Sequence, residues 1–73
     1  MAHFVDGWIW EPTDLIVLRQ ASRGAEFRSS PMYRMTADSL CDRNFLILTT
    51  FGGSVLKARL TTKGRQTAKK VLA

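Results

Sequence analysis

The residues of this 73-residue chain whose types and spacing could do chemistry are cations, and they gather in its second half. Residues 43–73 contain seven lysines and arginines and no acid, whereas residues 1–42 contain four arginines against six acids. The two segments therefore carry +7 and −2, which gives the formal net charge of +5. A segment of one charge sign is typical of a surface that binds a polyanion. The alternative is a solvated surface that serves only solubility.

The best-supported functional pair is Lys57 with Arg59. In the run Val55–Leu60, the residues Val55, Lys57 and Arg59 alternate with Leu56, Ala58 and Leu60. Side chains alternate between the two faces of a strand, so one face carries the cations and the other is apolar. A second run of strand formers, Phe45–Thr50, precedes the turn Phe51-Gly52-Gly53-Ser54. Two such runs around a Gly-Gly pair predict a β-hairpin.

Two helices are expected before the hairpin. Pro12 suits the first position of a helix that ends near Arg23, because Gly24 is a natural residue just past a helix end. Ser29 or Ser30 followed by Pro31 predicts a second helix to about Arg43, with Asn44 as its stop. Residues 25–30 are expected to form a connector with Phe27 pointing inward. The inner face of the second helix is predicted at Met32, Met35 or Thr36, Ser39 and Leu40.

A third helix is expected after the hairpin, and a short arm before the first helix. Thr61-Thr62-Lys63-Gly64 predicts the helix start, and the buried stripe is expected at Gly64, Ala68 or Thr67, and Val71. Residues 1–11 read as an N-terminal arm or a short strand. Trp8 and Trp10 would share one face of it, either as core cover or as an interface. The whole chain, residues 1–73, is predicted to be one small α+β domain.

Catalysis has little support. His3 is the only histidine and Cys41 the only cysteine, and Asp42 beside Cys41 would raise the pKa of its thiol. Paired catalytic carboxylates, a phosphate loop and metal-ligand spacing do not occur in the sequence, so we expect neither an enzyme nor a cofactor. One cysteine forms no internal disulfide, and no apolar run approaches the roughly 20 residues of a membrane span. We therefore expect a cytoplasmic protein without a membrane partner.

Two phrases around the hairpin carry a family resemblance. Leu40-Cys41-Asp42-Arg43-Asn44-Phe45-Leu46 enters it, and Arg59-Leu60-Thr61-Thr62-Lys63-Gly64-Arg65 leaves it. With the order (β)-α-α-β-β-α, these phrases resemble the abbreviated winged-helix, or winged helix-turn-helix-like, domains of small bacterial and phage proteins. The match covers roughly residues 13–73, and Leu60 to Arg65 is its most specific part. Asn44 stands where that family usually has glycine, and one helix of the full fold is missing, since only residues 25–39 lie between Gly24 and Leu40.

The resemblance implies binding of duplex DNA, as a transcriptional regulator or a phage accessory factor would bind it. The second helix would approach the major groove. The predicted β-hairpin, which is called the wing in that family, would reach phosphates. The implied DNA-binding residues are Arg28, Tyr33, Arg34, Thr36, Lys57, Arg59, Lys63 and Arg65. Asp38 and Asp42 would oppose this if they faced DNA.

The alternative is a protein-interaction module on the same scaffold that does not bind DNA. Its adhesive patch would draw on Trp8, Trp10, Phe51 and the pair Met32 and Met35. A homodimer through the arm or the first helix is compatible with both hypotheses.

Overall fold

A three-stranded antiparallel sheet forms the centre of the computed structural model, which describes residues 3–5, 7–50 and 54–72. The predicted hairpin is present as β4 (Leu46–Thr50) and β5 (Val55–Leu60). Of its predicted turn, residues 51–53 lie outside the described residues. The third strand, β3 (Phe27–Arg28), pairs with β5, so the order is β3-β5-β4. The prediction of a plain connector at residues 25–30 was therefore wrong, although Phe27 does point inward and is buried.

The first two helices have the predicted limits to within one residue. Helix α1 (Pro12–Arg23) begins with proline at its first position and ends at Gly24, whose φ is 64°. Helix α2 (Pro31–Asp42) is capped by Ser30, whose hydroxyl accepts a hydrogen bond from the Tyr33 N–H at 3.2 Å. In each case the proline fixes the first helical φ and loses no hydrogen bond.

The buried face of α2 agrees with the predicted one at Leu40 and differs from it at Met32 and Met35. Met32 and Met35 are 58% and 73% exposed, while Ala37 and Leu40 are fully buried. Tyr33 is half-buried, and its ring meets Phe27 edge-on at 6.1 Å. Residues 33, 37 and 40 form a stripe at the same helical spacing as the methionine stripe. In the folded protein the stripe of residues 33, 37 and 40 is the buried one, because this orientation of α2 brings a tyrosine ring and Leu40 to the core.

The N-terminal arm is a hairpin of its own and not a single strand. Strands β1 (His3–Val5) and β2 (Trp8–Trp10) are antiparallel and are joined through Gly7, whose φ is 82°. Trp10 is fully buried, its ring lies 5.0 Å from that of Phe45, and its Nε1 donates to the Val5 carbonyl at 3.1 Å. Trp10 is therefore core cover, which removes it from any adhesive patch.

Helix α3 (Thr62–Val71) follows β5, and two predictions are confirmed where the chain enters and leaves the β4–β5 hairpin. Asn44 has the expected positive φ, 66°. The Thr61 hydroxyl caps α3 by accepting from the Gly64 N–H at 2.9 Å, and it donates to the Asn44 carbonyl. Gly64, Thr67 and Ala68 are the buried residues of α3. Gly64 is needed because a Cβ there would overlap the Phe45 carbonyl.

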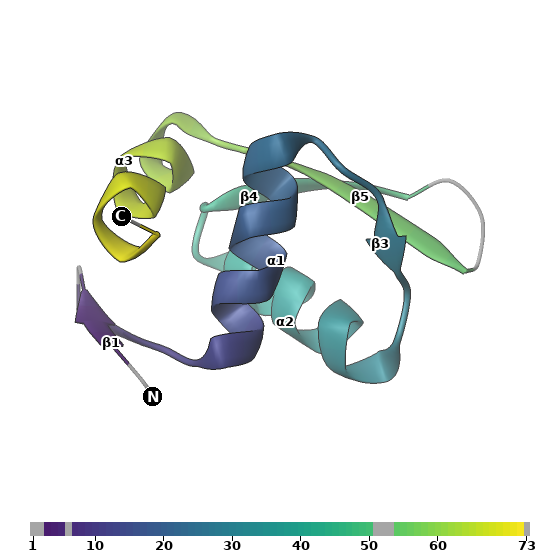
Figure 1. The fold of residues 1–73 in the computed structure, drawn as a ribbon, viewed down its shortest axis with the longest axis horizontal. Helices are drawn as coiled ribbons and strands as arrows, with labels where there is room; N and C mark the ends of the chain where they lie inside the picture. Colours follow the sequence, from purple (N-terminus) through teal and green to yellow (C-terminus); the bar gives the residue numbers. More distant parts are fainter. Residues whose placement is uncertain (1–2, 6, 51–53, 73) are drawn as a thin grey trace.

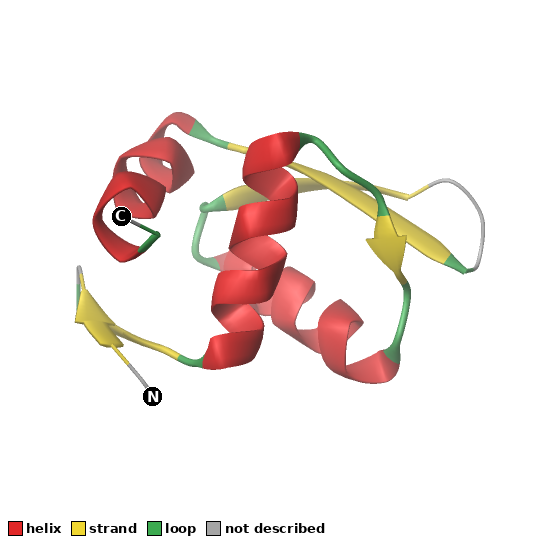
Figure 2. Cartoon of the chain, viewed as in Figure 1, coloured by secondary structure: helices red, strands yellow, loops and turns green. Residues whose placement is uncertain are grey.

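The helices are distributed unevenly around the sheet. Helix α1 packs on β5 and α2 on β4, and the alternating burial along β5 leaves the opposite face of the sheet toward solvent. The β1–β2 hairpin and α3 lie together at one end, near both chain termini (Figures 1 and 2). Among the described residues, no helix has the length and apolar character that crossing a membrane would require.

Replacing Gly64 with alanine tests the close approach of α3 to Phe45. In an exposed helix the change would gain up to about 1 kcal/mol of helix propensity. Here the new Cβ meets backbone, and backbone cannot move aside as a side chain can. We expect Gly64→Ala to lower the free energy of unfolding, measured by urea denaturation, by about 1–3 kcal/mol. Gln66→Ala, at an exposed site of the same helix, is the control and should leave it nearly unchanged. A Gly64→Ala variant as stable as the original protein would contradict the packing described here.

Candidate nucleic-acid interface

The register of the sheet gathers cations on its solvent face. Lys57 pairs with Thr49 and Arg59 with Ile47 across β4 and β5, while Arg28 pairs with Val55 across β3 and β5. Paired residues share a face, and so do residues two apart in one strand. This face, called the cationic sheet face below, therefore consists of Arg28, Ile47, Thr49, Val55, Lys57 and Arg59.

A cross-strand hydrogen bond and two buried side chains hold the cationic sheet face in place. The Thr49 hydroxyl donates to the Lys57 carbonyl at 2.9 Å, which ties the two strands together beside the lysine. Arg28 and Arg59 are exposed, and Lys57 is half-buried. On the other side of the same strands, Leu56 and Ala58 are fully buried. A slip of one residue would exchange these two sets, so the buried pair fixes where the cations point.

A fourth cation joins this face from α3. Arg65 and Arg59 line one hollow together with Ile47. This hollow lies next to the start of α3. Both guanidinium groups belong to exposed residues. Arginine presents a planar set of donors that matches a phosphate or carboxylate. The hollow therefore offers two such groups toward one anionic ligand or two neighbouring phosphates.

The opposite end of the face is less positive. Arg28 lies in a second hollow with Glu26, Ser29 and Ser54. The Glu26 carboxylate reduces the positive potential there. Lys57, Arg59 and Arg65 are thus the strongest part of the candidate interface.

Two other cations of the C-terminal segment have structural contacts. Lys63 donates from Nζ to the Arg43 carbonyl at 3.1 Å, and its Nζ lies 4.8 Å from the centroid of the Phe45 ring. The Arg43 guanidinium lies 4.3 Å from the centroid of the Trp8 ring. Such cation–π contacts stabilise both partners. Lys63, a predicted phosphate contact, is thereby held against the end of α2.

The predicted base-reading residues of α2 are not presented together. Tyr33 and Thr36 are half-buried, and the Tyr33 ring packs on Phe27. Arg34 is exposed, but Asp38 and Asp42 follow it at intervals of four residues, so all three lie along one side of the helix. The carboxylates would repel phosphates that approached Arg34.

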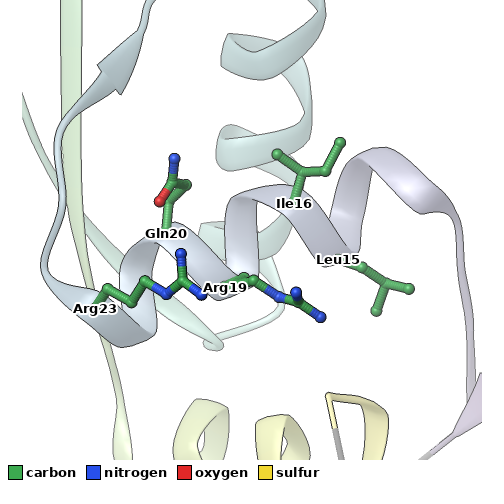
Figure 3. A pocket seen from close by; sticks show the side chains of 5 residues that line it. All are labelled: Leu15, Ile16, Arg19, Gln20 and Arg23. Carbon is green, nitrogen blue, oxygen red and sulfur yellow. The ribbon is translucent and has the colours of Figure 1, made fainter.

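A hollow on α1 was not anticipated from the sequence. Leu15, Ile16, Arg19, Gln20 and Arg23 line it (Figure 3). Ile16 and Gln20 point to the side of α1 on which α2 lies in this view, and Leu15 points to the side of α3. The signal available in the sequence was the spacing of Ile16, Arg19 and Arg23, which places an apolar residue and two cations on one helix face.

Cys41 is a half-buried thiol at the edge of the core. Burial raises the pKa of this thiol above its ordinary value, and the nearby carboxylates of Asp38 and Asp42 raise the pKa further. A hydrogen bond from the Leu48 backbone acts in the opposite direction but does not outweigh them. The direction confirms the prediction from sequence, and it is opposite to what a nucleophilic cysteine needs.

The pH dependence of Cys41 alkylation checks this environment. Iodoacetamide reacts with the thiolate, so the rate should rise with a midpoint above the ordinary cysteine pKa, and unfolding in urea should return the midpoint to that ordinary value. Asp38→Asn with Asp42→Asn should lower the midpoint only partly, because burial is the largest cause. A midpoint at or below the ordinary pKa in the folded protein would contradict the described packing.

No group of three or more histidine, cysteine or acidic residues that could hold a metal ion occurs in residues 3–5, 7–50 and 54–72. Comparison with known proteins gives no match to a family model, to a curated protein or to a solved structure.

Proposed function

We propose that this chain binds duplex DNA through the phosphate backbone, with the cationic sheet face and Arg65 as the contact surface. The observation that carries the proposal is the strand register, which puts Lys57 and Arg59 on one face of the sheet; Arg65 of α3 lines a hollow with Arg59 at the same face. No acidic residue occurs from position 43 onward. A duplex presents closely spaced phosphates, and these attract the group of Lys57, Arg59 and Arg65, which comes from the part of the chain without acids.

The spacing of these side chains suits a polyphosphate. Residues two apart in a strand are separated by about 6.6 Å, so Lys57 and Arg59 can contact two different phosphates. The lysine supplies a mobile point charge and the arginines supply bidentate donors. Contacts of this kind hold a protein on the duplex without reading its sequence.

This proposal moves the binding surface away from α2. Arg34 stays a candidate contact, but Tyr33 and Thr36 are half-buried and two carboxylates flank Arg34. We therefore assign the main phosphate contacts to the β4–β5 hairpin and the start of α3. The expected function as a cytoplasmic regulator or phage accessory factor remains part of the proposal.

The relationship to winged-helix domains is likewise a proposal. It is supported by the order of α1, α2, the β4–β5 hairpin and α3, by the positive φ of Asn44 before the hairpin, and by the close approach of Gly64 to the Phe45 carbonyl after it. Strand β3 and a second strand in the N-terminal arm are additions to the order expected from sequence.

The salt dependence of binding measures how many phosphates the protein contacts. Fluorescence anisotropy with a labelled random duplex should show binding that weakens steeply with salt. Three or four neutralised phosphates predict a slope of about −3 to −4 for log K against log salt concentration. Absence of binding at low salt would refute the proposed function.

A pair of double variants locates the contact surface. Lys57→Ala with Arg59→Ala should weaken binding at least tenfold and reduce the slope by about 2, because two phosphate contacts are lost. The matched control is Lys69→Ala with Lys70→Ala, which removes the same charge from the far end of α3. Circular dichroism should show both variants folded. Equal loss of affinity in the two variants would mean that net charge, and not the sheet face, governs binding.

A further inference from the structure

Helices α1 and α2 carry two stripes of the same spacing and opposite charge. Each stripe begins four residues after the proline that opens its helix, and continues three and seven residues further on. On α1 the stripe is Ile16, Arg19 and Arg23, and on α2 it is Met35, Asp38 and Asp42. In both, an apolar residue is followed by two charged residues on one helix face.

Both stripes are open to solvent. Ile16 is 45% exposed and Met35 is 73% exposed, and the four charged residues are exposed as well. Large apolar side chains that are exposed close to one another are typical of an interaction surface. The α1 stripe lines a hollow, so it can receive side chains from a partner.

The two stripes belong to neighbouring elements of one surface. Helix α1 packs directly against α2. Near the starts of both helices, the Thr13 hydroxyl lies 3.9 Å from the Met32 sulfur, and Met32 is 58% exposed at this junction. The two helices thus expose large apolar side chains, Ile16 on α1 and Met32 and Met35 on α2, with basic residues on one helix and acidic residues on the other.

We propose that this surface binds a second copy of the same chain in a two-fold symmetric dimer. In such an interface, a residue of one copy contacts a different residue of the other, and the reverse contact forms as well. Laying α1 on α2 of the second copy in parallel brings Ile16 to Met35, Arg19 to Asp38 and Arg23 to Asp42. Symmetry makes each contact twice, so four ion pairs surround an apolar centre. The proposal does not depend on DNA binding.

A second copy is the occupant because the chain carries its own complement. A nucleic acid would be attracted by Arg19 and Arg23 but repelled by Asp38 and Asp42. A partner with charges of one sign would meet repulsion on one of the two helices. Only a partner with both charge signs in the reversed arrangement fits, and α1 and α2 of another copy have that arrangement.

The dimer should be weak and sensitive to salt, since its ion pairs lie at an exposed rim. Sedimentation velocity at protein concentrations from micromolar to millimolar should show a monomer–dimer equilibrium that shifts toward monomer as salt is added. A chain that stays monomeric over this whole range at low salt would overturn the proposal.

Charge reversal tests the pairing itself. Arg19→Glu with Arg23→Glu, and Asp38→Lys with Asp42→Lys, should each raise the dissociation constant of the homodimer at least tenfold. An equimolar mixture of the two variants should restore a dimer. The acidic α1 of the first variant then meets the basic α2 of the second, and the unchanged basic α1 of the second meets the unchanged acidic α2 of the first, so both α1–α2 contacts are attractive. Dimerisation of either variant alone at the original strength, or a mixture that stays monomeric, would overturn the proposal.

Two further variants keep the test independent of folding and of DNA binding. Met35→Asp changes a side chain that is mostly in solvent, so the fold should persist while the dimer is lost. Lys57→Ala with Arg59→Ala should dimerise as the original chain does. Failure of DNA binding with an intact dimer would remove the proposed function alone, and a monomer that still binds DNA would remove this inference alone.

Discussion

The Thr61 side chain, held between the Asn44 carbonyl and the Gly64 N–H, is the constraint on which the rest of the structure depends. It joins the start of β4 to the start of α3, and the Thr61 N–H adds a backbone bond to the Phe45 carbonyl at 3.1 Å. This junction positions Phe45, which is fully buried and packs against Trp10. One hydroxyl therefore connects the sheet, α3 and the N-terminal hairpin.

Around the same junction, some cations of the second half of the chain make structural contacts and others line the surface. Lys63 and Arg43 lie against Phe45 and Trp8, where their charges stabilise aromatic rings and the end of α2. Arg59 and Arg65, on the two sides of the Thr61 turn, line a hollow at the surface. A segment with seven cations is thus divided between structural contacts and groups that can face a ligand, and charge counting alone does not reveal the division.

The two surfaces proposed to bind partners follow different electrostatic rules. The sheet face is dominated by positive charge, which favours a uniform polyanion and gives strong dependence on salt. The α1–α2 surface carries both signs around an apolar centre, which favours a partner with the complementary arrangement. One face of the three-stranded sheet packs against the helices and the other faces solvent. The cationic sheet face and the core are therefore the two sides of the same strands.

Sequence alone determined the elements with strong local signals. Proline at a helix start, glycine or asparagine at a helix end, and alternation along β5 act over a few residues, so the limits of α1, α2, α3 and the hairpin followed from them. The grouping of Lys57 with Arg59 followed from the same alternation. The start of α3 at Thr61-Thr62-Lys63-Gly64 was also expected, because a threonine before a first helical turn satisfies free N–H groups whatever the tertiary fold.

Tertiary structure decided what depends on partners distant in the sequence. Strand β3 has two residues and exists only because β5 supplies its hydrogen bonds, and that pairing places Arg28 on the cationic sheet face. The choice between two apolar stripes of α2 was made by Phe27 and α1, which left Met32 and Met35 in solvent. Trp10 became core because the hairpin turned it onto Phe45. Local patterns define each element, but which face of an element is buried depends on the element that packs against it.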